Sequence, residues 1–296
     1  RSLTIDNLHI LGDIFDRGPR PDIILEELMH FHDVDIQWGN HDISWMGAAT
    51  GNRACICNVL RMALGYNGFD VLEDGYGINL RPLSMFAERV YRDDPCTCFL
   101  PQILDKNIYD AVDPKLAAKM HKAITVIQFK VEGQITKRHP DYQINDRIHL
   151  EHINFEKGTV NIHGKDYKML DMNFPPIDPK DPLKLTKEEQ ELINSLALSF
   201  HHSETLHRHI RFVYSHGAMY TRCNSNLLYH GCIPMKEDGT FEELKLKGII
   251  YSGKRLLDYL EDVVKMAYFL PDDDPTKDWY RDFMWYLWCG PKSPVY

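Results

Sequence analysis

The first forty residues alternate between short apolar runs and polar turns. An apolar run at 8–11 ends at Gly12, which is typical of a β-strand. Apolar residues then recur at helical spacing between 22 and 31. The segment VDIQW at 34–38 is a second predicted strand, and it ends at Gly39. The order strand, helix, strand predicts a βαβ unit with parallel strands and a right-handed crossover.

The pattern after this unit is mainly helical. Apolar periodicity predicts helices through most of 44–125, and alternation with glycine-containing turns predicts small antiparallel strands in 148–170. Thr186 and Glu189 form a capping box that opens one long predicted helix over 187–210. The last part of the chain has an apolar strand pattern at 226–229 and an amphipathic helix pattern at 256–270.

This distribution predicts an α/β protein with a divided core. We expect the core to combine residues 1–50 with residues 210–296. The intervening residues, 51–209, form a mainly helical insertion with a small β-hairpin.

Composition narrows the functional classes. The 296 residues are 44% hydrophobic and 26% charged, which is ordinary for a globular protein and excludes collagen-like or largely disordered chains. The net charge of −9 argues against electrostatic capture of nucleic acid or an anionic membrane, and we expect neither as a partner. No apolar run reaches membrane-spanning length. The seven cysteines lack the C-x-x-C spacing of metal or redox motifs, so we expect reduced thiols and a cytoplasmic location.

Two polar segments carry the candidate chemistry. Residues 12–18 (GDIFDRG) follow the first predicted strand, and residues 39–42 (GNHD) follow the second. Because parallel strands deliver both loops to the same carboxyl edge of the sheet, we expect these side chains to meet there. The two segments together resemble the signature of the calcineurin-like metallophosphatases, whose core is an α/β sandwich.

The resemblance assigns a role to each residue type. Asp13 bridges two divalent cations, since a carboxylate has two donor oxygens, and Asn40 offers a neutral amide oxygen to one of them. The metals then acidify a water molecule and hold the phosphate for in-line attack. His41 acts as general acid on the departing alkoxide, and Asp16 orients its ring. Arg17 grips phosphate oxygens with its planar fork of donors.

A further metal ligand is expected from a histidine at the end of an apolar strand. His230 follows the strand pattern at 226–229 and precedes a glycine, as in the next motif of the superfamily. His216, after the shorter apolar run at 212–214, is the rival candidate. We favour His230, because the apolar run before it has the clearer strand pattern.

Two motifs of the superfamily are missing. The leading Asp-x-His is replaced by Asp6-Asn7-Leu8, and no late Gly-His-Thr motif occurs. The chain also begins without methionine. These features predict that it is an internal part of a longer protein.

The resemblance extends to a particular family, the class III fructose-1,6-bisphosphatases of Firmicutes and related bacteria. It covers nearly the whole chain, and the diagnostic segments are 8–52, 73–83, 226–234 and 282–290. It implies hydrolysis of the C1 phosphate of fructose 1,6-bisphosphate, a small-molecule sugar bisphosphate, in gluconeogenesis. The implied cofactor is Mn²⁺, two ions per active site. Asp13, Asn40 and His230 are the implied ligands, His41 with Asp16 supplies the proton, and no covalent phosphoenzyme forms.

Two other functions stay open at this point. The sequence also leaves open whether the protein forms a homo-oligomer. A protein Ser/Thr phosphatase would share the motifs, but those enzymes carry Glu where this chain has Asp42, and they lack the long insertion. A catalytically silent assembly or regulatory module would have an incomplete metal site. Metal content and phosphopeptide hydrolysis distinguish these alternatives.

Overall fold

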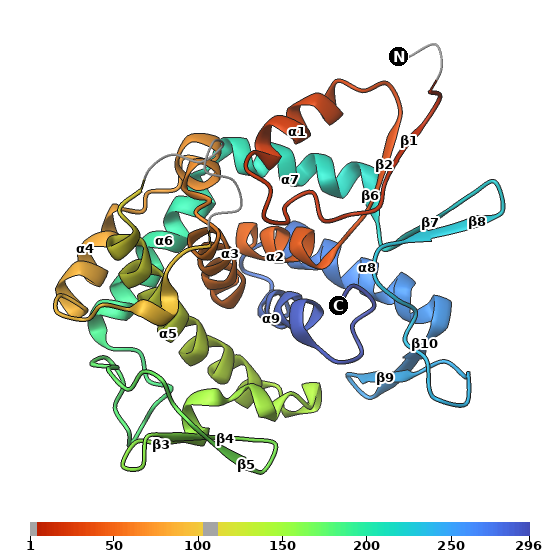
Figure 1. The fold of residues 1–296 in the computed structure, drawn as a ribbon. Coiled ribbons are helices and arrows are strands. Elements are labelled where there is room, and N and C mark those ends of the chain that lie inside the picture. The colour runs from red at the N-terminus through yellow and green to blue at the C-terminus, as the bar shows by residue number, and fades with distance from the viewer. Residues whose placement is uncertain (1–4, 103–111) are drawn as a thin grey trace. The chain divides into compact units, whose positions relative to one another are not determined.

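The computed structural model describes residues 5–102 and 112–296, which form a mixed α/β structure of two compact units. Unit 1 combines Arg1–Cys55 with Ser203–Tyr296, and unit 2 is Ile56–His202. The chain leaves unit 1 inside helix α3 (Arg53–Gly65) and returns to it at Ser203 (Figure 1).

The centre of unit 1 is a small parallel sheet. Strand β1 (Leu8–Ile10) pairs with β2 (Val34–Gln37), which pairs with β6 (Gly217–Ala218). Helix α1 (Pro21–Met29) joins the first two strands, as Figure 1 shows, and this confirms the predicted βαβ unit. Helix α2 (Asn40–Ala49) starts immediately after the end of β2.

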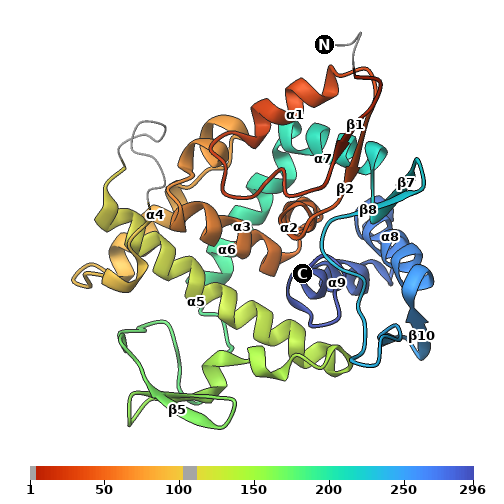
Figure 2. The same cartoon turned by 45° about the vertical axis from the view of Figure 1, so that its right-hand side comes forward.

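Helices cover most of the rest of unit 1, as seen in the turned view of Figure 2. Helix α2 packs against three of them, and two hairpins lie between these helices in the sequence. The helices are α7 (Glu204–His216), α8 (Gly253–Phe269) and α9 (Lys277–Cys289). The hairpins pair β7 (Tyr220–Cys223) with β8 (Asn226–Tyr229), and β9 (Glu243–Leu246) with β10 (Ile249–Ser252).

The predicted helix over 187–210 is wrong at one point. The structure has two helices there, α6 (Lys187–His202) and α7, separated at Ser203. The Ser203 hydroxyl accepts the backbone N–H of Leu206 at 3.3 Å and caps the start of α7. A serine side chain competes with the helical hydrogen bonds in this way, and apolar periodicity alone does not reveal it.

Unit 2 is built mainly from helices α3, α4 (Arg81–Val90), α5 (Pro114–Arg138) and α6. A π-helical turn (Val71–Gly75) follows α3, and short 3-10 segments occur at Thr97–Phe99, Pro140–Tyr142, Asn145–Arg147 and His149–His152. Where we expected a small hairpin, three antiparallel strands form: β3 (Ile153–Asn154), β4 (Thr159–Ile162) and β5 (Lys165–Lys168).

Helix α5 carries a buried lysine that ties two loops to it. The Lys122 side chain is fully buried, and its ammonium group lies 2.6 Å from carboxylate oxygens of Asp94 and Asp171. It also lies over the rings of Tyr91 and Phe174. A buried charge is tolerated only when it is paired, so the ammonium group and its two carboxylates hold both loops against α5.

A second buried lysine meets the predicted capping box. Glu189 accepts the backbone N–H of Thr186 at 2.7 Å, and the backbone N–H of Glu189 donates to the Thr186 hydroxyl at 3.1 Å, which confirms the box. The same Glu189 carboxylate accepts a hydrogen bond from Lys130 of α5 at 2.7 Å. The start of α6 is therefore joined to α5 by a buried ion pair.

Two further findings concern the chain as a whole. No disulfide joins the seven cysteines, all of which lie within the described residues. Within residues 5–102 and 112–296, no helix is long and apolar enough to cross a membrane.

Candidate metal centre

The first part of the centre is the turn that follows β1. Gly12 and Asp13 have φ angles of 84° and 56°, a left-handed conformation that is costly for a residue with a Cβ. A Cβ on Gly12 would lie 2.5 Å from the Gln37 carbonyl oxygen and 2.8 Å from His230 Nδ1. The turn therefore needs glycine here, and it brings Asp13 against the end of β2.

The second part is the first turn of α2. The strand-end glycine predicts a loop at residues 39–42, but the structure places Asn40 and His41 inside the helix, with Gly39 as its N-cap. The backbone N–H of His41 donates to Asp13 Oδ1 at 3.1 Å. A carboxylate is favourable at this place, because the free N–H groups of a helix N-terminus carry partial positive charge.

Asp42 joins both parts, and it is not among the site residues that the sequence predicts. Its fully buried carboxylate accepts backbone N–H groups from Gly39 at 2.9 Å, Asp13 at 2.8 Å and Phe15 at 3.4 Å. Burial raises the pKa of Asp42 to about 6 despite these hydrogen bonds. The signal that could have revealed it is an acidic residue at the third position of a helix after a strand end.

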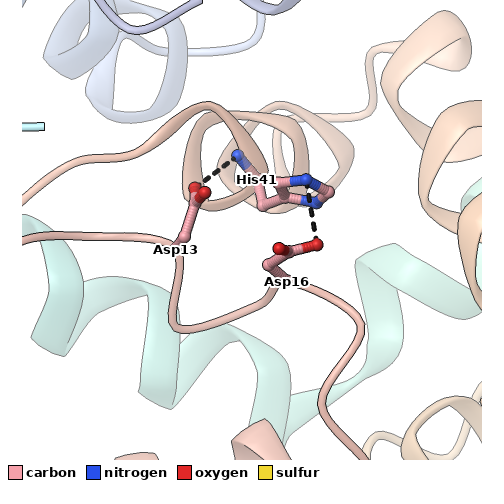
Figure 3. A group of neighbouring side chains, drawn as sticks. All are labelled: Asp13, Asp16 and His41. Atoms are coloured by element: carbon pink, nitrogen blue, oxygen red, sulfur yellow. Dashed lines mark hydrogen bonds and ion pairs between the residues drawn. The ribbon is translucent and has the colours of Figure 1, made fainter. Parts of the chain in front are cut away.

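His41 and Asp16 are in direct contact. His41 Nε2 lies 3.1 Å from Asp16 Oδ1, while the backbone of His41 contacts Asp13 (Figure 3). Arg17 Nε donates to Asp16 Oδ1 at 2.8 Å, and Arg17 Nη2 donates to Oδ2 at 3.2 Å. One carboxylate therefore orients both an imidazole and a guanidinium group, and the half-exposed Arg17 side chain faces solvent as well.

His230 approaches Asp13 from another element. Its Nε2 lies 3.3 Å from Asp13 Oδ2, and its Nδ1 is 2.6 Å from the Leu11 carbonyl oxygen. The predicted strand before it is β8, which pairs only with β7 among the described strands. The loop after this hairpin nevertheless brings the imidazole to the sheet edge.

His216, the rival candidate, lies elsewhere in unit 1. It is the last residue of α7, and its Nδ1 is 3.2 Å from the Phe212 carbonyl oxygen and 2.9 Å from the Ser215 hydroxyl. The apolar run at 212–214 is helical, so it does not form the strand that this alternative required.

The side chains at the edge can hold a divalent cation. Ligand atoms of Asp13, Asp16 and His41 all lie within 4.8 Å of one another. Oxygen and imidazole donors suit manganese, iron or zinc. The orientation of His230 also fits, because metal-binding histidines commonly donate their second ring N–H to a carbonyl and direct the other nitrogen to the metal. Asn40 is adjacent, as the first residue of α2.

Neighbouring charges and burial set the protonation of these groups. Burial opposes ionisation of Asp13, but the His230 hydrogen bond and charge, with the His41 N–H, outweigh it and lower the pKa of Asp13. The hydrogen bond to Asp13 raises the pKa of His230 to about 9. Burial lowers the pKa of His41, although the charges of Asp16 and Asp13 oppose this effect.

Comparison with known proteins identifies the family. A sequence model described as Firmicute fructose-1,6-bisphosphatase matches residues 1–296. The chain is 55% identical over 294 residues to a protein of Clostridium novyi, covering 99% of this chain and 44% of that protein. It is 54% identical over 296 residues to a protein of Clostridium tetani, covering 100% of this chain and 45% of that protein. Both are named fructose-1,6-bisphosphatase class 3.

The chain thus spans less than half the length of these curated relatives. No solved structure gives a significant match. The family match nevertheless covers every residue, including both segments that form the centre. The chain therefore belongs to the Firmicute fructose-1,6-bisphosphatase family.

Proposed function

We propose that the protein containing this chain hydrolyses the C1 phosphate of fructose 1,6-bisphosphate to fructose 6-phosphate and phosphate. Family membership supports the substrate. The observation that carries the proposal is the convergence of Asp13, Asp16 and His41 at the carboxyl edge of β1 and β2, because this arrangement combines metal ligands with a proton donor. Such a reaction belongs to gluconeogenesis in the cytoplasm.

Mn²⁺ is the proposed metal, with two ions per active site. Asp13 is the proposed bridging ligand, with Asn40 and His230 as ligands of one ion. The distance of 3.3 Å between Asp13 Oδ2 and His230 Nε2 supports this set, since the two atoms are close enough to bind the same cation. Bound cations supply an acidified water and neutralise charge on the phosphate.

The residues of the chain supply the remaining steps. Water attacks phosphorus and forms the new bond between oxygen and phosphorus, while the bond between phosphorus and the sugar oxygen breaks. His41 donates a proton to this departing sugar oxygen. Asp16 holds the imidazole in place through the 3.1 Å contact and stabilises its protonated form. Arg17 contacts phosphate oxygens from the solvent side of Asp16, using donors of its planar fork.

A metallophosphatase sandwich is the fold that we propose for the core. The parallel order β1-β2-β6, with the candidate ligands at its carboxyl edge, supports it. Residues 1–50 and 210–296 contribute this core, and 51–209 are the insertion.

The decisive assay is phosphate release from fructose 1,6-bisphosphate with and without Mn²⁺. It uses the complete protein, because the relatives are more than twice as long as the matched region. We expect turnover that chelation abolishes and that His41→Ala lowers about 10²- to 10⁴-fold. Asp13→Asn is expected to reduce bound metal as well. His216→Ala is the matched control, and it should leave turnover unchanged.

The remaining outcomes separate the alternatives. Phosphate release from a phosphopeptide but not from the sugar bisphosphate would support a protein phosphatase. Absence of both turnover and bound metal would support a silent module. Unchanged turnover of His41→Ala would exclude the proposed general acid.

A further inference from the structure

The last turn of α9 contacts the imidazole of His41. The ring centroids of Trp288 and His41 are 5.1 Å apart, and the ring planes are nearly perpendicular at 84°. The His41 side chain is 13% exposed, and Trp288 is partly buried. Helices α2 and α9 pack against each other within unit 1, so this ring contact belongs to a larger helix interface.

Contacts of the residues before and after Trp288 hold the end of α9 in place. The preceding residues 283–287 are buried, and Trp285 is fully so. The Ser293 hydroxyl donates to the Leu287 carbonyl oxygen at 2.7 Å, folding the segment after α9 back onto the helix. The side-chain amide of Asn52 also donates to the Arg281 carbonyl oxygen at 2.7 Å. The end of helix α9, which carries Trp288, is therefore held in place within unit 1.

The segment that follows α9 also holds the loop carrying His230. The backbone N–H of Cys232 donates to the Pro294 carbonyl oxygen at 2.7 Å. A Cβ on Gly231 would lie 2.5 Å from the same oxygen, so the two backbones are in close contact. Residues 288–294 thus contact His41 directly and also contact the two residues that follow His230.

We propose that Trp288 is a positioning residue that holds the His41 ring in the orientation set by Asp16. The carboxylate restrains one ring nitrogen, and the perpendicular indole restrains rotation of the ring plane. Perpendicular ring contacts of this kind are favourable beyond the surface area that they bury. The inference rests on the proposed role of His41 as general acid, and it assigns a function to a residue outside the metallophosphatase motifs.

The test is a double-mutant cycle measured as kcat for fructose 1,6-bisphosphate in the complete, Mn²⁺-loaded protein. Trp288→Leu is expected to lower kcat about tenfold with little change in KM, since misplacing a catalytic group affects the chemical step. Trp288→Phe, which keeps an aromatic edge, should restore most of this loss. In the His41→Ala background, Trp288→Leu should produce no additional loss.

Trp279→Leu is the matched control. Trp279 lies on the same helix, is also partly buried, and packs against Phe283 and Lys247 away from His41. Trp279→Leu should have the same small effect on kcat in the wild-type protein and in the His41→Ala variant. If Trp288→Leu does not fold, Trp288→Met takes its place in the cycle, because its flexible chain fills space without a ring.

The outcomes separate this inference from the proposed function. If Trp288→Leu lowers kcat by the same factor in wild type and in His41→Ala, the positioning role is wrong and Trp288 contributes only to packing. A wild-type kcat in Trp288→Leu, together with a strong loss in His41→Ala, would also overturn it while preserving the general acid. Retained turnover in His41→Ala would contradict the proposed general acid, on which this inference rests. Absence of fructose 1,6-bisphosphate hydrolysis by the wild-type protein would contradict the proposed function itself.

Discussion

Two buried acids differ in what surrounds their oxygens. Asp42 accepts three backbone N–H groups and thereby joins the turn after β1 to the start of α2. Both Glu132 oxygens, in contrast, lack a hydrogen-bond partner among the residues described, although the side chain is only 1% exposed. Arg147 Nη1 lies 4.0 Å away. Glu132 is therefore a buried group whose charge is poorly compensated within unit 2.

Stability should depend on pH through Glu132. Burial raises its pKa to about 7, although the positive charges of Arg147 and Arg61 oppose this shift. In the unfolded chain the pKa is near the ordinary value of about 4.5, so the folded state holds the proton more tightly between about pH 4.5 and 7. Stability contributed by the neutral acid is present below this window, is lost as pH rises through it, and levels off above about pH 7.

The test compares urea unfolding of wild type and Glu132→Gln at pH 5 and pH 8. The shift corresponds to about 3 kcal/mol of unfolding free energy. The loss of unfolding free energy between pH 5 and pH 8 should therefore be smaller in Glu132→Gln than in wild type by about that amount. The exposed Glu156→Gln serves as the control and should retain the wild-type dependence. An identical pH dependence in Glu132→Gln would show that this carboxyl group is not the cause.

At the scale of elements, the short strand β6 depends on close contact with a tryptophan. A Cβ on Gly217 would lie 2.0 Å from Trp38 Nε1 and 2.2 Å from the Val213 carbonyl oxygen. Those two groups form a buried hydrogen bond of 3.0 Å. Gly217 is therefore required by space, and its extended backbone (φ −115°) is not strained.

Gly217→Ala should destabilise unit 1 by about 1–3 kcal/mol, because a methyl group has no room in a close-packed interior. Gly68→Ala is the comparison, since its Cβ would have its nearest neighbours at 3.5 Å, an ordinary contact distance. The measurement is the thermal unfolding midpoint of both variants. A smaller loss in Gly217→Ala than in Gly68→Ala would contradict the packing argument.

Elements were predictable where their signals are local. The apolar runs and glycines around β1, α1 and β2 lie within forty residues, and Thr186 with Glu189 marks the start of α6. The break at Ser203 was not predicted, because a capping serine interrupts an apolar pattern that continues on both sides. The pairing of β8 was also missed, since strand pairing depends on partners that periodicity does not identify.

At the scale of the whole molecule, every candidate ligand belongs to unit 1, although residues 13–41 and His230 are far apart in the sequence. Metal binding should therefore stabilise one unit selectively. A ligand at about 100 times its Kd adds about 2.7 kcal/mol to the state that binds it. Helix α5 has no candidate ligand in this group and should gain nothing.

Hydrogen exchange of the complete protein measures this effect. Adding Mn²⁺ should slow exchange of unit 1 amides in β1, β2 and the first turns of α2 by up to about 100-fold. Amides of α5 in unit 2 are the internal reference. Asp13→Asn should show no slowing in either unit, and equal slowing of both units in wild type would contradict a site confined to unit 1.

The sequence by itself determined the βαβ order and the two polar segments at the strand ends, and it predicted Asp13, Asp16 and His41 as site residues. These are local signals, because strand ends and turn glycines are encoded by neighbouring residues. Only the tertiary structure decided that Asp42 joins the two segments, that His230 arrives from a hairpin, and that Trp288 contacts His41. Those contacts join elements separated by up to about 250 residues, and the packing that creates them depends on the volumes and partners of many side chains together.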